Sequence, residues 1–186
     1  AEAAASVKQT LDRVEQALGD SDTLILDSVH ISMRVLLAEA EAVGSPAAGP
    51  PVAVGSQTVP ELLLGRRGQA NATALVDRFK ALTTSTATLF SRRGDDFVRI
   101  STNVLQANGQ RAVGTPLDPS GKAIAALRQG SAFYGMVEIL GEPYITGYEP
   151  MHDAQGATIG AWYAGRPVST LTLLNDAIGS TRILSS

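Results

Sequence analysis

The residues of this chain that can do specific chemistry gather in its second half. Arg99 and Ser101 lie in a stretch of alternating apolar and polar residues at positions 97–105. All four tyrosines follow, at positions 134, 144, 148 and 163. A guanidinium matches the planar fork of a carboxylate, and tyrosine hydroxyls donate hydrogen bonds from rigid side chains. This set of residue types suits the binding of a small anionic ligand.

Two arrangements explain the alternating pattern. Because side chains alternate between the faces of a strand, Arg99 and Ser101 are expected to share one face, with Thr102 on the other unless a bulge breaks the alternation. An antiparallel sheet with one solvent-exposed face gives the same pattern as strands that line a pocket. The residues alone leave both arrangements open and slightly favour the exposed face.

Other kinds of site have little support in the sequence. The two histidines, His30 and His152, are far apart and lack a metal-binding spacing, and the absence of cysteine excludes thiolate sites. Nucleotide-binding loops and serine nucleophile elbows are missing. A hydrolase or isomerase that uses His152 with Asp153 or Glu149 would need a base held in a cleft. We therefore expect no enzyme, and no catalytic residue, metal or cofactor.

Length and composition narrow the class of protein. The chain has 186 residues, of which 44% are hydrophobic and 18% charged, as is typical of a folded globular protein. Its net charge of −3, without a long basic run, argues against nucleic-acid binding. The longest apolar run, residues 123–127, is far too short to span a membrane. Neither end has a signal peptide or a helix stop, so we expect a segment of a longer protein.

Hydrophobic spacing predicts the elements that position these residues. Apolar residues recur every three or four positions from residue 7 to residue 43. They predict one long helix, or two joined at Gly19, that ends at Gly44. Residues 46–60 are expected to form an irregular connection, residues 59–64 a short strand, and residues 71–82 a helix.

The remaining stretches predict a sheet. The expected elements are strands over 86–91, 97–105, 134–140, 144–151 and 158–167, a helix from Asp118 to Gly130, and a final helix over 170–184. Short turns between the strands dictate antiparallel pairing. The predicted fold class is α+β, with a long N-terminal helix packed on a five-stranded antiparallel sheet.

Four segments in the last hundred residues resemble a known family. They are FVRISTNV at 97–104, GTPLD at 114–118, GEPYITGYEP at 141–150 and IGAWY at 159–163. They resemble the single Cache sensor family, and more narrowly the PAS-like Cache 3/Cache 2 fusion type of bacterial methyl-accepting chemotaxis receptors and sensor kinases. The resemblance covers about residues 58–168. It implies a periplasmic ligand-binding domain of an inner-membrane protein, flanked by two transmembrane helices.

The resemblance also implies a division of the chain and a ligand. Residues 1–45 would form a signalling helix, residues 46–168 the PAS-like Cache ligand-binding domain, and residues 169–186 a helix leading toward a second transmembrane segment. Family members are associated with small organic acids, so the expected ligand is an acetate-like acid of two to four carbons. The alternative is a ligand-free interaction module that signals through a partner protein.

Carried over by position, Arg99 would anchor the carboxylate. Tyr134, Tyr144 and Tyr148 would donate hydroxyl hydrogen bonds, and Ser101 would contribute from the face of Arg99. The long helix is compatible with a parallel homodimer and equally with packing on its own sheet.

Overall fold

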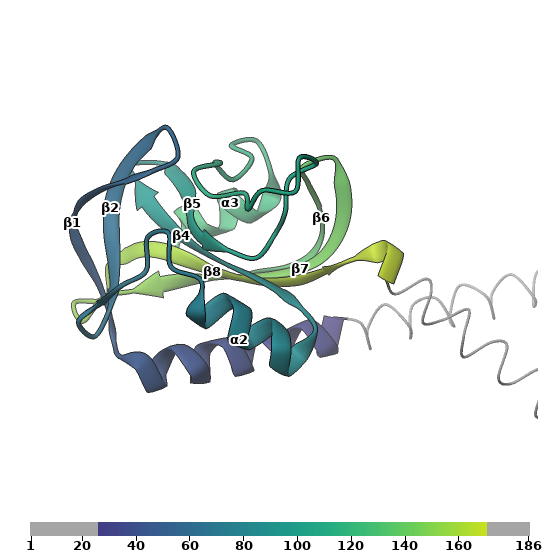
Figure 1. The fold of residues 1–186 in the computed structure, drawn as a ribbon, viewed down its shortest axis with the longest axis horizontal. Helices are drawn as coiled ribbons and strands as arrows, with labels where there is room; N and C mark the ends of the chain where they lie inside the picture. Colours follow the sequence, from purple (N-terminus) through teal and green to yellow (C-terminus); the bar gives the residue numbers. More distant parts are fainter. Residues whose placement is uncertain (1–25, 171–186) are drawn as a thin grey trace, which may run out of the picture.

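The structure, a computed structural model, describes residues 26–170. A five-stranded antiparallel sheet lies between two layers (Figure 1). The helices α1, over residues 26–43, and α2, Ala74–Thr83, pack on one face, and α3, Lys122–Arg128, with the loop before it packs on the other. The predicted α+β fold is confirmed.

The central strand of the main sheet is the last strand of the chain. The five strands are β4 (Thr86–Arg93), β5 (Asp96–Thr102), β6 (Phe133–Ile139), β7 (Glu142–His152) and β8 (Thr158–Pro167). Their order is β5-β4-β8-β7-β6, and each neighbouring pair is antiparallel. Because β8 pairs with both β4 and β7, the two halves of the sheet meet along it.

A second, three-stranded sheet replaces the irregular connection expected over residues 46–60. It consists of β1 (Pro46–Val54), β2 (Gln57–Leu64) and β3 (Arg67–Gly68) in that order. The prediction is wrong because the prolines do not prevent strand pairing here. β1 is an edge strand, and its register with β2 shifts between Ala48 and Pro51, where Pro50 and Pro51 have no N–H to donate.

Helix α1 packs through one stripe of side chains. Val29, Met33, Leu36 and Ala40 are buried at a spacing of three and four residues. The helix ends before Gly44, as predicted, and position 44 requires glycine because the backbone of Gly65 lies so close that no side chain would fit there. The expected helix break at Gly19 lies outside the described residues. So does the expected final helix over 170–184, except for residue 170.

The two faces of the sheet have different cores. The helix-face core joins α1 and α2 to the small sheet and to inward residues of the main sheet, including Met33, Leu36, Leu62, Val76, Phe79, Leu89, Ile100 and Trp162. The aromatic core lies on the α3 side, and its buried members are Phe90, Phe97, Val104, Ala112, Leu117, Ala123, Ile124, Leu127, Ile139, Tyr144, Tyr148, Ala161 and Tyr163. The sheet therefore separates the long helix from most of the chain's aromatic side chains.

Helix α3 begins later than predicted. Asp118 does not cap it, because its Oδ1 accepts hydrogen bonds from the N–H and the hydroxyl of Ser120, at 3.0 and 2.9 Å, in a turn before the helix. These hydrogen bonds lower the pKa of the Asp118 carboxyl. The inward residues Ile124 and Leu127 are buried as predicted.

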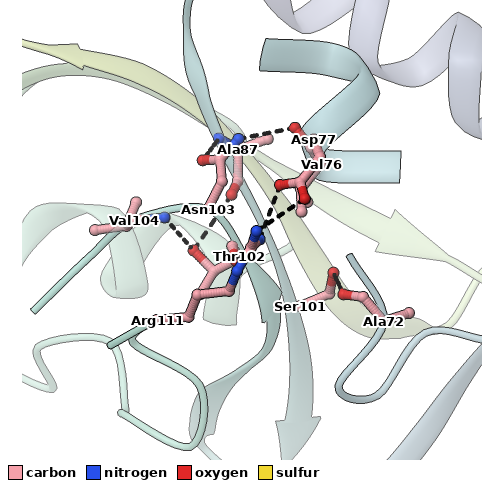
Figure 2. A network of polar contacts seen from close by, with 9 residues as sticks. All are labelled: Ala72, Val76, Asp77, Ala87, Ser101, Thr102, Asn103, Val104 and Arg111. Carbon is pink, nitrogen blue, oxygen red and sulfur yellow. Dashed lines mark hydrogen bonds and ion pairs between the residues drawn. The ribbon is translucent and has the colours of Figure 1, made fainter. Parts of the chain in front are cut away.

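Polar contacts fasten α2 to its surroundings (Figure 2). Asn103 accepts a hydrogen bond from the N–H of Ala87 and donates one to the carbonyl of Val76, both at 2.8 Å. The carboxylate of Asp77 accepts hydrogen bonds from both terminal nitrogens of Arg111, each at 2.8 Å. The next residue, Arg78, pairs with Glu39 of α1 at 2.7 Å.

Replacing Asn103 by alanine should destabilise the fold by about 2 kcal/mol, because it leaves a buried N–H and a carbonyl without partners. Chemical denaturation measures this change in the free energy of unfolding. Asn108→Ala is the control, since Asn108 is exposed and makes only a local turn contact. Equal stability of the two variants would contradict the bridging role of Asn103.

Candidate functional site

Arg99 lies in the middle of β5 and turns its side chain into the aromatic core. Only 5% of the residue is exposed, and it is the one charged residue among the buried side chains of residues 26–170. Its guanidinium carbon lies 5.1 Å from the centre of the Phe90 ring, within the range of a cation–π contact. The open question from the sequence is therefore answered in favour of an inward-facing arginine.

The guanidinium has neutral partners only. Its Nη1 donates to the hydroxyl of Thr115 and the carbonyl of Pro116, both at 3.0 Å, and more weakly to the carbonyl of Thr115 at 3.4 Å. Within residues 26–170, no carboxylate pairs with it, and Nε and Nη2 form no hydrogen bond. A buried charge is costly unless an opposite charge or hydrogen bonds compensate it. Because Nε and Nη2 are not among the fully buried unpartnered polar atoms of residues 26–170, this edge of the cation keeps some contact with solvent and is the part that the protein itself does not hydrogen-bond.

Burial lowers the pKa of Arg99, and the nearby Tyr148 and Tyr163 hydroxyls partly oppose that shift. The guanidinium nevertheless stays charged, because its ordinary pKa is above 12. The same burial raises the pKa of Tyr148 and of Tyr163. Both phenols therefore remain protonated at neutral pH and can donate hydrogen bonds.

Tyr148 carries the second unusual feature of this region. The residue is fully buried, and its hydroxyl is the one buried side-chain polar atom in the described part of the chain with no hydrogen-bond partner. Such atoms are rare in folded proteins and call for an explanation. Its neighbour Tyr163, 5.2 Å away between ring centres, differs in that its hydroxyl is hydrogen-bonded to Thr86 at 2.9 Å.

Tyr144, predicted as a hydroxyl donor, also belongs to the aromatic core. It lies four residues before Tyr148 on β7, so the two side chains share a face of the sheet. Burial is the main cause of its raised pKa, followed by the charge of Glu142. Arg99, Tyr144 and Tyr148 are thus the predicted residues that the fold brings to one side of the sheet.

Ser101 does not share the face of Arg99, and that expectation is wrong. Phe90 pairs with Arg99 while Leu89 pairs with Ser101, so β5 contains one extra residue and the alternation shifts. Ser101 therefore faces α2, where its hydroxyl donates to the carbonyl of Ala72 at 2.6 Å (Figure 2). Thr102 turns to the other side and contacts Thr88 at 2.6 Å.

Tyr134 also lies on the opposite face from Arg99. It pairs with Gly147 on β7, stacks on His30 of α1 at 3.5 Å between ring centres, and donates to Glu149 at 2.7 Å. Its pKa is raised chiefly by burial and then by Glu149. The strand register therefore places Tyr134 on the opposite face of the sheet from Tyr144 and Tyr148, and the expected grouping of the three is wrong.

Three cavities are candidates for a ligand-binding site. Two lie on the helix side, of about 350 and 360 Å³, and some of their charged groups have partners: Arg78 pairs with Glu39, and Glu149 accepts from Tyr134. A third, of about 170 Å³, lies between the start of α3 and β6, and several of its apolar walls belong to the aromatic core or pack on it. Arg99 and the Tyr148 hydroxyl are on the same side of the sheet as this third cavity, but neither residue lines any of the three.

Comparison with known families identifies the family of the chain. The family model described as the Cache 3/Cache 2 fusion domain matches residues 1–186. The chain belongs to the Cache 3/Cache 2 fusion family. No curated protein matches the chain.

Cache domains are non-catalytic sensors, typically extracytoplasmic parts of chemoreceptors and kinases. The geometry around His152 is consistent with this, because Asp153 caps its own turn through Gln155 and Ala157 and Glu149 bonds Tyr134. In residues 26–170, no cluster of three or more His, Asp or Glu could hold a metal, and none of the helices is long and apolar enough to cross a membrane.

Sequence reasoning missed two residues near Arg99, Phe90 and Thr115, and it gave no separate role to Tyr163. The face of the sheet on which Tyr134 lies could have been predicted from the sequence. The two-residue turn Leu140–Gly141 pairs Ile139 with Glu142, and this register places residue 134 opposite residue 147. Both turn residues have positive φ, at 51° and 85°, as the tight hairpin turn requires. For Thr115, in a loop, the sequence contains no comparable signal.

The two central tyrosines should respond differently to loss of the hydroxyl. Tyr148→Phe should leave the free energy of unfolding unchanged or raise it by up to about 1 kcal/mol, because it removes an unpaired buried group. Tyr163→Phe should lower it by about 1 kcal/mol, because it removes a made hydrogen bond. Denaturation of this matched pair measures both, and an equal loss in the two variants would show that Tyr148 has a partner.

Proposed function

We propose that this domain is the extracytoplasmic sensor of a transmembrane chemoreceptor or sensor kinase and binds a small monocarboxylate, of two to four carbons, at Arg99. One observation carries the proposal: a buried guanidinium with no acidic partner lies close to a buried tyrosine hydroxyl with no partner at all. A carboxylate accepts from both groups and neutralises the charge. Family membership supports the sensing role, and these two residues support the ligand class.

The charge of the aromatic core argues for one carboxylate rather than two. Arg99 is the only buried charged residue in the described range, and the buried side chains of the aromatic core are uncharged. A second carboxylate would be buried without a partner, which costs several kcal/mol. A short alkyl tail, in contrast, fits the surrounding hydrocarbon.

Ligand size limits the affinity. The best small ligands gain about −1.5 kcal/mol per non-hydrogen atom, so a four-atom acid reaches roughly −6 kcal/mol, a Kd of about tens of micromolar. Such a value requires an enclosed site, since an exposed ion pair contributes at most about 1 kcal/mol. The burial of Arg99 meets this condition.

Calorimetry with acetate, propionate and butyrate tests the proposal, with succinate as the two-charge comparison. The wild type should bind at least one monocarboxylate, and Arg99→Ala should weaken that binding at least about a hundredfold, as expected for a buried charge pair. Arg93→Ala is the matched control, because Arg93 is an exposed arginine on the neighbouring strand. Unchanged binding in Arg99→Ala would remove Arg99 from this role.

A ligand-free interaction module is the second candidate. Its supporting observation is an apolar surface between α1 and α2, where Ile31 and Leu82 are 60% and 57% exposed beside a cavity of about 340 Å³. This candidate predicts that none of the acids above binds or raises the melting temperature.

Signalling requires that α1 respond to the site on the far side of the sheet. The stack of His30 on Tyr134 provides the contact, because Tyr134 pairs with β7 directly beside Tyr148 and bonds Glu149. A shift of β7 around the ligand therefore moves the ring on which α1 rests. A ligand can drive such a change only if it binds the two arrangements with different affinity.

Replacing His30 by alanine should uncouple α1 without affecting the site. Hydrogen exchange of residues 26–43, with and without saturating ligand, should change in the wild type and stay constant in His30→Ala, while the Kd stays within about twofold because His30 lies across the sheet. Glu41→Ala is the control on the same helix. A wild-type response in His30→Ala would exclude this route.

A further inference from the structure

The segment over residues 111–117, here called the strap, runs along the free edge of β5. Three backbone hydrogen bonds tie it to that strand: Arg99 N–H to Thr115 at 3.0 Å, Gly114 N–H to Arg99 at 2.7 Å, and Leu117 N–H to Phe97 at 2.8 Å. Arg111 fastens its start to Asp77 of α2 and to the carbonyl of Thr102 (Figure 2). The strap is therefore a fixed part of the wall around Arg99.

Thr115 is the strap residue that meets the guanidinium through its side chain. Its hydroxyl donates to the carbonyl of Ala112 at 2.5 Å and accepts from Nη1 of Arg99 at 3.0 Å. Because the hydroxyl proton is committed to Ala112, the oxygen lone pairs are directed to Arg99. With the carbonyl of Pro116 also at 3.0 Å, Nη1 has an acceptor for each of its two N–H groups.

A guanidinium has five N–H donors, so this arrangement leaves one at Nε and two at Nη2. The N–H groups of Nε and Nη2 that lie side by side form an edge that binds both oxygens of a carboxylate at once. Resting on the proposed function, we infer that Thr115 is a positioning residue: it holds Nη1 so that the Nε–Nη2 edge of Arg99 faces the ligand carboxylate. The strap thereby selects a planar, two-oxygen anion.

The first test compares acetate or propionate binding, whichever the wild type prefers, in Thr115→Val and Thr115→Ser. Thr115→Val should bind about tenfold more weakly, because Nη1 loses its side-chain acceptor and the guanidinium can turn. Thr115→Ser keeps the hydroxyl and should bind within about twofold of the wild type. Melting temperatures without ligand verify folding, and Thr115→Ala replaces the valine variant if that one fails to fold.

The outcomes separate the two proposals. If the wild type binds no monocarboxylate, or Arg99→Ala binds as well as the wild type, the proposed function itself is wrong. If binding depends on Arg99 but Thr115→Val and Thr115→Ala match the wild type, only the positioning role is wrong. A loss that serine does not restore also overturns that role, because it would reflect packing rather than the hydroxyl.

A measurement on the wild type needs no folded variant. In a proton–nitrogen NMR spectrum, the Nε–H signal of Arg99, assigned by its absence in Arg99→Lys, should move downfield when acetate or propionate saturates the site. A signal that stays in place at saturation would mean that the ligand uses another edge of the guanidinium, and the inference would fail.

Discussion

The cost of burying a guanidinium without an acid shapes the α3 side of this domain. Arg99 is surrounded by the Phe90 ring, strap oxygens and tyrosine hydroxyls, none of which carries a full negative charge. These contacts compensate only part of the hydration that the side chain loses. The strap oxygens and the register shift in β5 place this cation on the α3 side, and its remaining edge is the basis of the proposed preference for an anion.

Local patterns predicted the strands, the end of α1 and the inward residues of α2 and α3, because these depend on spacing within one element. The face of Ser101 was not predictable, since one extra residue in β5 reverses the alternation and no residue type marks it. The strand predicted over 59–64 lies within β2, whereas β1 was missed because its prolines indicate a break, although an edge strand tolerates proline.

The site itself was predictable only in part. Arg99 and Tyr148 lie together on the α3 side of the sheet and their role as ligand contacts stays a prediction, whereas Tyr134 contacts α1 on the other face and Thr115 belongs to a loop without periodicity. Pairing across the sheet decides which side chains meet, and that information is distributed over distant segments. The position of Tyr134 on the other face places it against His30 of α1, so it connects the sheet to that helix.

Helix α2 links the strap to α1 through its neighbouring residues Asp77 and Arg78. Asp77 fixes the strap through Arg111, and Arg78 fixes α1 through Glu39. These ion pairs are partly exposed, so each contributes little stability and can rearrange easily. Through these two ion pairs on consecutive residues, α2 connects the strap to α1 by a path that does not pass through the main sheet.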